Sequence, residues 1–435
     1  MSSSLIVWMN GQRVGVWTQA RGSATFQYDP AWAAAPNRRR VSLSLDFQPG
    51  NAEHKGAVVT DYFDNLLPDS EPIRQRLQSR FGTESRQAFD LLKAIGRDCV
   101  GAVQLLPEGE EPSEIQTVRA EPLDDEGVER AIGAALSGSR VLGQADAEEF
   151  RISIAGAQEK IALLRHQNQW CRPLGATPTT HILKLPLGVI GNMQANMQDS
   201  VENEWLCLRL MAAFGLDTAR AEIREFINRK VLVVERFDRV WQDDTWIARR
   251  PQEDFCQALG RPGHRKYESE GGPGMKDILD VLAFSADSTR NRRDFAKAQL
   301  IFWLMAATDG HAKNFSLFHE QGGIYRLTPF YDVLSAWPII GPGTNQLAWQ
   351  KATLAMAIRG KNPHRKLMDI KPRHWQAVAK QAGLGDADNL INEVLQAVPK
   401  VLAAVEAEVP ENFPGRIQDT IFEGIQQQAK VLAAG

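Results

Sequence analysis

The stretch MAATDGHAKNFSLF, residues 305–318, places an aspartate, a histidine, a lysine and an asparagine directly behind an apolar run. Asp309 and Asn314 have the D-x-x-x-x-N spacing found where one loop carries both a base for an attacking hydroxyl and an amide oxygen for Mg²⁺. His311 makes the pattern D-x-H-x-x-N. The spacing indicates phosphoryl transfer, although a helix C-terminus with Gly310 as its left-handed cap fits the same residues.

A second acidic residue follows in YRLTPFYDVLSA, where Asp332 comes after an apolar and aromatic run. Taken alone, Asp332 is the kind of carboxylate that a turn or a cap uses. Together with Asn314 it would offer hard oxygen ligands from two loops, which suits Mg²⁺ held largely by substrate phosphates. We therefore predict that Asn314 and Asp332 bind the metal.

A phosphate-binding loop is predicted upstream, in FRISIAGAQEKIALL. Ala155, Gly156 and Ala157 are small residues between two strand-like runs, so that backbone N–H groups there could approach phosphates. The segment departs from G-x-G-x-x-G and lacks the G-K-[ST] of a Walker A motif. We predict that these three residues and Gln158 bind the nucleotide.

Lys184 lies in the apolar strand THILKLP, where a lysine needs an anionic partner unless its side chain reaches solvent. The partner is sought in SVENEWLCLRLMAAFG, a predicted helix that Ser200 opens as N-cap and Gly215 closes. Glu204 falls on the apolar stripe of this helix and Glu202 does not. We predict a Lys184–Glu204 ion pair that positions the phosphates of the nucleotide.

An adenine site is predicted where the buried strand of KVLVVERFDR ends, at Glu235, Arg236 and Phe237. Their backbone groups could meet the base, with an aromatic face beside it. An ordinary central strand that ends in a charged turn fits the same residues.

Several local patterns predict the elements that would support these loops. FAKAQLIFWLMAA, before the loop of Asp309, is apolar almost all round, which is typical of a buried helix. Asn10-Gly11 predicts a type I′ hairpin between two β-rich runs. Ser70, Glu71 and Pro72 resemble a helix start.

At 435 residues, with 43% hydrophobic and 24% charged residues, the chain can bury a large core and is expected to form several domains. Residues 107–130 hold nine acidic and two basic residues with little apolar periodicity, which predicts a linker or a solvated strip. We predict an α/β subdomain over 1–140, an ATP-binding mixed α/β lobe over 141–255 and an α-helical lobe over 256–435.

The longest apolar run, Leu300 to Ala307, is far shorter than the ~20 residues of a membrane span. MSSSLIVWMN lacks the basic flank and the apolar length of a signal peptide, so we predict a cytoplasmic protein without a membrane partner. The four cysteines are scattered without a C-x-x-C pair, which predicts buried free thiols. With a net charge of −3, any contact with nucleic acid must come from a local patch.

These segments together carry a resemblance. FRISIAGAQEK, TPTTHILKLP, VVERFDR, PQEDFCQALG, AATDGHAKNFSLF, LTPFYDVLSA and YFDNLLPDS resemble the HipA family, the serine/threonine kinase toxins of bacterial type II toxin–antitoxin modules. The resemblance runs through essentially the whole chain, with no departure at the positions that matter. It implies an α+β, two-lobed kinase-like fold of the PI3/4-kinase-like type, with a β-rich N-terminal lobe and an α-helical C-terminal lobe.

The resemblance also implies roles in the loops described above. Asp309 would be the catalytic base, and Asn314 and Asp332 the Mg²⁺ ligands in a site that uses ATP. The D-x-H-x-x-N pattern also resembles phosphoinositide kinases, in which the histidine faces the transferring phosphate. His311 and Lys313 are therefore expected to stabilise charge in the transition state.

Target, regulation and partners follow from the same resemblance. The family phosphorylates a protein serine or threonine, notably in glutamate–tRNA ligase, and is inhibited by phosphorylation of a serine in its own phosphate loop, a position that Ser153 matches. A HipB-like antitoxin dimer with a helix-turn-helix fold and, through it, operator DNA are the implied partners. The run from Lys351 to Trp375 holds seven Lys or Arg and one acidic residue. We predict that Lys371 and Arg373 contact DNA phosphates there, although such runs are usually solvated faces.

Two functions of other classes compete with this interpretation. A metal-dependent phosphohydrolase would use Asp309, His311 and Asp332 around a catalytic ion, but it needs more ligands than the sequence offers and leaves Lys184 unexplained. A non-catalytic DNA-bound scaffold would rely on the basic run 351–375.

Overall fold

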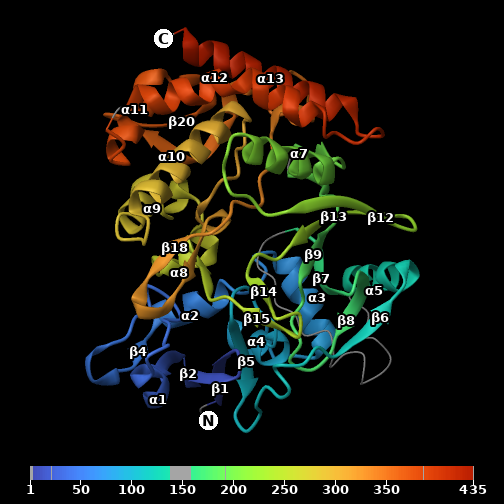
Figure 1. Ribbon diagram of the computed structural model, residues 1–435, viewed down its shortest axis with the longest axis vertical. Coiled ribbons are helices and arrows are strands. Elements are labelled where there is room, and N and C mark those ends of the chain that lie inside the picture. Colours follow the sequence, from blue (N-terminus) through green and yellow to red (C-terminus); the bar gives the residue numbers. More distant parts are fainter. Residues whose placement is uncertain (1–2, 21, 138–157, 192, 386, 435) are drawn as a thin grey trace. The chain divides into compact units, whose positions relative to one another are not determined.

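The computed structural model describes residues 3–20, 22–137, 158–191, 193–385 and 387–434 (Figure 1). The chain forms two compact units, and each unit is built from several segments that are separate in the sequence. Both units combine helices with antiparallel strand pairs. Unit 1 comprises Met1–Leu185, Arg224–His264 and Ser316–Tyr325, and unit 2 comprises Pro186–Ile223, Arg265–Phe315 and Arg326–Gly435.

The N-terminal part of unit 1 is a five-stranded sheet in the order β4-β3-β2-β1-β5. Asn10 and Gly11 have φ of 45° and 79°, which confirms the predicted hairpin between β1 and β2. Helix α3 begins at Glu71 after Ser70, also as predicted. The elements of this part are β1 (Ser3–Met9), β2 (Gln12–Ala20), β3 (Ser23–Tyr28), α1 (Pro30–Ala34), β4 (His54–Lys55), α2 (Ala57–Asp64), α3 (Glu71–Phe81), α4 (Ala88–Ile95) and β5 (Val103–Pro107).

Helices cover this first sheet and form one hydrophobic core with it. Trp17 of β2 stacks on Phe63 of α2 with ring centroids 4.1 Å apart, and Phe89 of α4 meets the same indole edge-on. All three side chains are buried in one cluster with the inner face of β1. β1 is apolar on both faces: Leu5, Val7 and Met9 enter this core, whereas Ile6 and Trp8 form a second cluster with Leu106.

A six-stranded sheet in the order β12-β13-β9-β7-β8-β6 is the second sheet of unit 1 and has its own hydrophobic core. Residues 107–130, predicted as a linker or a solvated strip, are mostly exposed. Within them, residues 120–130 form the edge strand β6 and the start of α5, and Val128 and Ile132 of α5 enter the core of this sheet. The elements are β6 (Ala120–Leu123), α5 (Asp125–Ser137), β7 (Lys160–His166), β8 (Gln169–Pro173), β9 (His181–Lys184), β12 (Ala221–Phe226) and β13 (Arg229–Glu235).

Smaller elements complete unit 1. They are the hairpin of β14 (Arg239–Gln242) and β15 (Trp246–Arg249), the short helix α8 (Phe255–Ala258), and the sheet of β16 (Gln252–Asp254), β17 (Ser316–His319) and β18 (Tyr325–Leu327). Only the first residue of β18 belongs to unit 1. Asp254 caps α8 in a capping box with Gln257.

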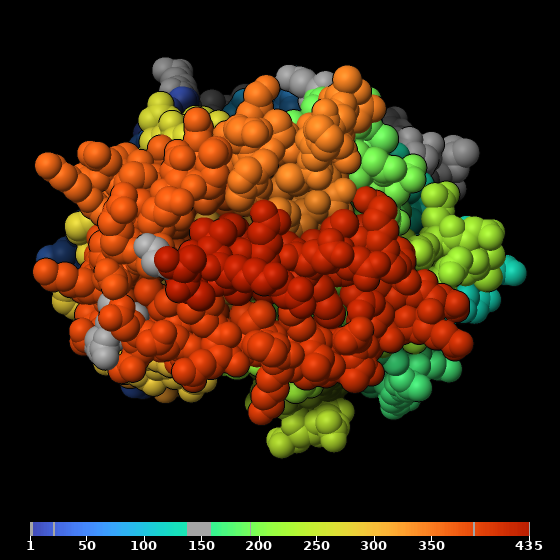
Figure 2. All heavy atoms as spheres, turned by 90° about the horizontal axis from the view of Figure 1, so that it is seen from above, coloured from blue at the N-terminus to red at the C-terminus, as the bar shows by residue number. Residues whose placement is uncertain are grey.

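Unit 2 is mainly helical, and α11, α12 and α13 lie together at its C-terminal end (Figure 1). Figure 2 shows the face that α12 and α13 cover. The 256–435 segment was predicted to be helical, but it also contains strands β17 to β20. The elements are β10 (Gly188–Ile190), β11 (Ala195–Met197), α7 (Ser200–Ala213), α9 (Met275–Leu282), α10 (Ser288–Leu304), β19 (Thr353–Arg359), β20 (Pro363–Lys366), α11 (Pro372–Gln381), α12 (Ala387–Glu406) and α13 (Gly415–Ala433).

Helix α10 is the central support of unit 2. Its second half is buried on all sides, from Phe295 to Leu304, which confirms the prediction from FAKAQLIFWLMAA. The four cysteines are buried and free, as predicted. In the described part of the chain, no helix is both long and apolar enough to span a membrane.

Candidate active site

The loop that carries Asp309 begins where α10 ends. Ala306, not Gly310, takes the left-handed backbone there, with φ of 49°. The alternative interpretation, a helix end capped by Gly310, is therefore wrong. Gly310 has another reason to be glycine: an added Cβ would come within 2.6 Å of the ring of Phe302 in α10.

Backbone hydrogen bonds fold residues 309–314 into a tight turn. His311 N–H donates to the Asp309 carbonyl at 2.8 Å, and Asn314 N–H donates to the His311 carbonyl at 2.9 Å. The amide nitrogen of Asn314 also donates to the Asp309 carbonyl, at 2.8 Å. His311, Lys313 and Asn314 are buried, whereas Asp309 is exposed. The hydrogen-bonded turn therefore holds one carboxylate, that of Asp309, toward solvent.

Tyr267 touches this turn from a segment that the sequence patterns did not single out. Its hydroxyl donates to Oδ1 of Asp309 at 2.5 Å, and its ring meets the His311 ring edge-on at 5.0 Å between centroids. The neighbouring Lys266 carbonyl accepts the Ala312 N–H at 3.3 Å. No local periodicity connects Tyr267 with Asp309; the glycine-rich KYESEGGPG around it is the only sequence signal that marks the segment.

The segment of Asp332 is fixed on both sides. On one side, the Tyr331 hydroxyl donates to the Lys313 carbonyl at 2.9 Å, which brings this segment to the turn of Asp309. Asp332 itself has φ of 58°, a left-handed backbone that only surrounding contacts can enforce on a residue with a side chain. Within unit 2 the structure therefore brings Asp309, Asn314 and the segment of Asp332 together.

On the other side, Asn203 of α7 binds Ser335. The Asn203 amide donates to the Ser335 carbonyl and accepts the Ser335 N–H, both at 2.8 Å. The Ser335 hydroxyl donates to the Met305 carbonyl at the end of α10, at 2.6 Å. No pattern in the sequence singles out Asn203, because an amide on a helix gives no sign of a partner that lies 132 residues away.

Helix α7 differs in detail from its prediction. It begins at Ser200 with Asp199 as N-cap, one residue earlier than predicted, and Gly215 follows its end with φ of 84°. Glu204 is buried, but so is Glu202, which the apolar stripe had placed off the buried face. The reason is that every residue from Ser200 to Leu208 is buried, so this stretch has no solvent face.

Asn314 and Asp332 supply oxygen atoms of the kind that Mg²⁺ prefers. Because the nitrogen of the Asn314 amide is bound to the Asp309 carbonyl, the oxygen of that amide is the atom left for a cation. One carboxylate and one amide oxygen fit an ion that takes its other ligands from water and phosphates.

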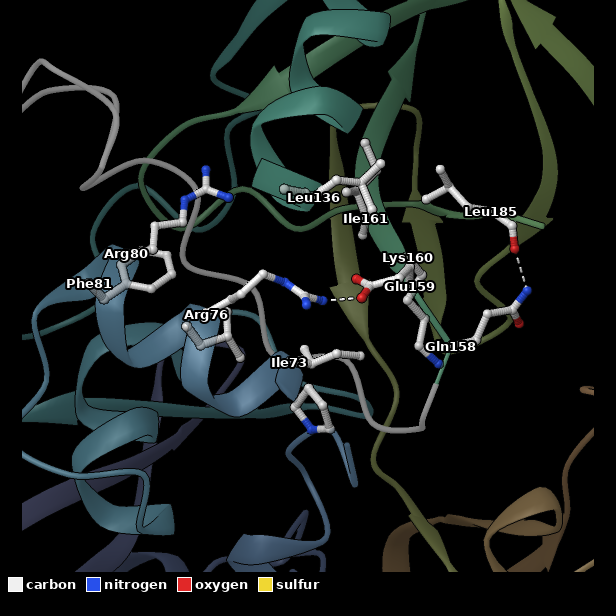
Figure 3. A pocket seen from close by; sticks show the side chains of 14 residues that line it. Ile73, Arg76, Arg80, Phe81, Leu136, Gln158, Glu159, Lys160, Ile161 and Leu185 are labelled. Atoms are coloured by element: carbon white, nitrogen blue, oxygen red, sulfur yellow. Dashed lines mark hydrogen bonds and ion pairs between the residues drawn. The ribbon is translucent and has the colours of Figure 1, made fainter. Parts of the chain in front are cut away.

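Lys184 and Gln158 lie together in unit 1. Lys184 is a buried residue of β9, opposite Lys160 of β7 and Leu232 of β13. Gln158 donates from its side chain to the Leu185 carbonyl at 2.6 Å, next to Lys184 (Figure 3). Ser153, Ala155, Gly156 and Ala157 lie outside the described residues. The Lys184–Glu204 pair stays a prediction.

A small pocket of about 90 Å³ lies beside Gln158, between α3 and β7 (Figure 3). Its wall is mostly apolar, and Arg76 of α3 forms an ion pair with Glu159 across it. Helix α3 therefore packs beneath the end of the predicted nucleotide-binding loop. The remaining wall includes Ile73, Leu77, Phe81, Leu136 and Ile161.

The predicted adenine residues differ in their surroundings. Glu235 is exposed, and Phe237 packs edge-on against Phe318 at 5.7 Å between centroids. Arg236, in contrast, uses its N–H to donate to the Thr180 carbonyl at 2.8 Å, and its side chain is buried. Arg236 cannot offer its N–H to a nucleotide in this arrangement, which leaves Glu235 and Phe237 as the candidates.

The guanidinium group of Arg236 belongs to a buried charge cluster, which we call the Asp98 network: Asp98, Arg236, Asp238, Arg239 and Arg249. Arg236 binds Asp238 through two nitrogens at 3.0 and 2.8 Å. Asp98 receives Arg239 at 2.9 Å, Arg249 at 3.1 Å and Arg236 at 3.3 Å. Three guanidinium groups and two carboxylates thus share one buried site.

Thr179 completes the hydrogen bonding of Asp98 with its N–H at 3.1 Å and its hydroxyl at 2.7 Å. Burial by itself would raise the pKa of Asp98, but Arg239, Arg236 and Arg249 outweigh it and hold that pKa below its ordinary value. The pKa of Asp238 is lowered in the same way by Arg236 and Arg239, against burial. Both carboxylates are thus kept ionised.

The predicted DNA contacts lie at the start of α11. Lys371 and Arg373 are exposed, and the Lys371 N–H donates to Nδ1 of His374 at 3.0 Å. His374 is buried and stacks on His364 with centroids 3.9 Å apart. Burial, and then the charge of His364, lower the pKa of His374.

Comparison with known families gives two matches along the chain. Residues 5–106 match the HipA N-terminal domain, and residues 152–402 match the HipA-like C-terminal domain. Together the two ranges contain every predicted site residue.

Individual relatives match most of the chain. The Sinorhizobium fredii protein named "Putative kinase Y4mE" is 35% identical over 92% of this chain and 91% of its own length. The Shewanella oneidensis protein named "Serine/threonine-protein kinase toxin HipA" is 27% identical over 81% of this chain and 78% of its own length. A solved structure of Shewanella oneidensis HipA, in a complex with HipB and its operator DNA, has the same fold: the TM-score is 0.79 at 22% identity, over 99% of this chain and 97% of that one.

Proposed function

This chain belongs to the HipA family, and we propose that it is a serine/threonine-protein kinase that transfers the γ-phosphate of ATP to a protein hydroxyl. The names of its relatives support a kinase. The observation that carries the proposal is the turn 309–314, which follows the buried helix α10. In this turn the exposed carboxylate of Asp309 lies beside a buried histidine, lysine and asparagine.

In this proposal, Asp309 accepts the proton of the serine or threonine hydroxyl while that oxygen bonds to the γ-phosphorus and ADP leaves. His311 and Lys313 face the transferring group and stabilise its negative charge. Asn314 and Asp332 hold Mg²⁺, which when bound neutralises phosphate charge. Residues 155–158 and Lys184, paired with Glu204, hold the phosphates, and Glu235 and Phe237 meet the adenine. We propose that the fold is two-lobed and of the PI3/4-kinase-like type. We also propose that the protein acts in the cytoplasm.

Incubation with γ-labelled ATP and Mg²⁺ tests the reaction. We expect label on protein from the wild type, and a loss of about 10²-fold or more in Asp309→Asn, which removes the base but keeps the size of the side chain. ATP binding by the mutant should persist. Release of free phosphate from phosphoesters, without label on protein, would support the metal-dependent phosphohydrolase instead.

The target and the self-inhibition are further parts of the proposal. We propose glutamate–tRNA ligase as the target and Ser153 as the site of inhibitory autophosphorylation, since a phosphate there would add roughly −1.5 to −2 charge beside the nucleotide phosphates. Ser153→Ala should phosphorylate its target but keep its activity on preincubation with ATP. If wild type and mutant lose activity equally, the switch lies elsewhere.

We propose a HipB-like antitoxin dimer as the partner, with the pair acting as an operator-bound corepressor. The solved Shewanella structure, in which HipA is in a complex with HipB and operator DNA, supports this assembly. Replacing Lys371 and Arg373 by Ala should weaken operator binding by the complex and flatten its salt dependence without changing the preferred sequence. If the affinity for operator DNA and its salt dependence stay unchanged, the basic run 351–375 is a solvated face. If the Asp309→Asn protein still represses normally, the scaffold role is separate from catalysis.

A further inference from the structure

We propose that Tyr267 is a positioning residue of this active site: its hydroxyl holds one oxygen of Asp309, so that the other oxygen faces the hydroxyl of the protein substrate. The inference rests on the proposed kinase function, because it gives Asp309 the role of base. It adds a residue 42 positions upstream of the turn that carries the chemistry.

The contact between the two side chains is short and directional. The Tyr267 hydroxyl donates to Oδ1 of Asp309 at 2.5 Å, in the range of O–H···O⁻ bonds to an ionised carboxylate. Asp309 is exposed, and an exposed carboxylate without such a donor samples several rotamers. One fixed oxygen leaves Oδ2 as the atom that receives the substrate proton, with its direction already set.

The ring of Tyr267 has a second contact in the turn. It meets the imidazole of His311 edge-on, at 5.0 Å between centroids and 87° between planes. His311 is buried, so this packing fixes the ring plane of Tyr267 independently of its hydroxyl. The two contacts together point the hydroxyl at Asp309 and at the same time support the histidine.

Glycines fold the segment so that Tyr267 points toward the turn. The Gly272 N–H donates to the Tyr267 carbonyl at 2.9 Å, and Gly271 has φ of 87°. An added Cβ on Gly272 would lie 2.1 Å from the Arg265 carbonyl oxygen and 2.8 Å from that of Tyr267. Only glycine allows this close turn, so GGPG in the sequence serves to place the preceding tyrosine.

Glu268 then ties the same segment to the β19–β20 hairpin. Its largely buried carboxylate accepts the Ala357 N–H and pairs with Arg359 and Arg365. These bonds do not involve the tyrosine hydroxyl. Deleting that hydroxyl should therefore leave the segment folded, which makes Tyr267→Phe a clean test.

Kinetics of phosphate transfer from ATP to protein separate positioning from structure. For Tyr267→Phe we expect kcat to fall about 10-fold while KM for ATP stays unchanged, because only the orientation of the Asp309 carboxylate is lost. The melting temperature should not move. Tyr62→Phe in α2 of unit 1 is the control and should behave as wild type, because the Tyr62 hydroxyl is buried without a hydrogen-bond partner in the described part of the chain.

A double-mutant cycle with Asp309→Asn decides whether Tyr267 acts through Asp309. Asp309→Asn with Tyr267→Phe should be no slower than Asp309→Asn alone. Losses that add, or a Tyr267→Phe protein as fast as wild type, would overturn this role and leave the kinase function standing. A wild type that transfers no phosphate to protein would overturn the kinase function and this role with it.

Discussion

The carboxylates of Asp98 in unit 1 and Asp309 in unit 2 have opposite surroundings. Asp98 is buried and receives three guanidinium groups, a hydroxyl and an N–H. Asp309 is exposed, and Tyr267 donates to one of its oxygens. A carboxylate whose lone pairs are all used can hold segments together but accepts a further proton only at low pH, whereas one held at a single oxygen has an atom left for a proton.

The different surroundings of the two carboxylates predict a structural role for Asp98 and a catalytic role for Asp309. Asp98 joins residues 98–101, between α4 and β5, to the β13–β15 region, since Arg239 also binds the Cys99 and Gly101 carbonyls. Removing its charge should therefore change folding. Asp309 has few contacts to lose, so its replacement should change catalysis and leave folding alone. Four changes, each measured by its effect on the free energy of unfolding, test this difference between Asp98 and Asp309.

The largest effect is expected from Asp98→Asn. It raises the net charge of the Asp98 network from +1 to +2 in a buried site, which should cost about 3–5 kcal/mol. The midpoint of urea unfolding, followed by tryptophan fluorescence, measures this loss. Glu121→Gln is the matched control: its pair with Arg172, at 3.2 Å, has a half-exposed carboxylate and should contribute less than about 1 kcal/mol. Equal midpoints for the two variants would contradict the comparison.

Gly310→Ala should have the next largest effect. The added methyl group would lie 2.6 Å from the Phe302 ring, and overpacking of this kind costs about 1–3 kcal/mol. Since the turn of Asp309 must shift to make room, the rate of phosphate transfer should fall as well. Gly133→Ala in α5 is the matched control, because no atom lies near the position of the added Cβ. Gly109→Ala would be unsuitable, because Gly109 has a φ of 90°. A Gly310→Ala protein as stable as wild type would show that Phe302 can move.

Acid should separate the same two carboxylates. Asp98 and Asp238 have folded pKa values below the ordinary ~3.9 of the unfolded chain, so the folded state binds fewer protons than the unfolded state in that range. Their contribution is complete above about pH 5 and is lost as the pH falls below about 4, by up to about 1.4 kcal/mol per pH unit for each group. Urea midpoints between pH 3 and pH 6 measure the slope. A slope below pH 4 that Asp98→Asn leaves unchanged would contradict this origin.

Asp309→Asn should have the smallest effect on unfolding. The amide can still accept the Tyr267 hydroxyl, and the site is exposed, so the change should stay within about 0.5 kcal/mol. The same urea experiment checks it beside the activity assay. A loss comparable with that of Asp98→Asn would mean that Asp309 is a structural carboxylate.

Local signals gave the predictions that the structure confirms. The Asn10-Gly11 hairpin, the start of α3 at Glu71 and the buried second half of α10 follow from backbone preferences and apolar periodicity within a few residues. The order of the loops came from the residues themselves, the family resemblance added the roles of those residues, and the family matches confirm the membership.

The misses share one physical cause. Residues 120–130 are mostly exposed, as a solvated strip would be, but the prediction did not include the edge strand β6, which becomes part of a sheet only through its neighbour β8. Glu202 was placed off the buried face because an apolar stripe describes a helix with one solvent side, and most of α7 has none. Burial depends on what surrounds an element, which its own sequence does not contain.

By itself, the sequence determined which short elements form and which residues stand on the turn after α10, since these depend on neighbours along the chain. Only the tertiary structure decided what those residues touch. Tyr267 meets Asp309, Asn203 meets Ser335, and Asp98 meets Arg239 across 42, 132 and 141 positions. Such pairs form because packing of distant segments brings a donor within about 3 Å of an acceptor, and no local period in the sequence encodes that distance.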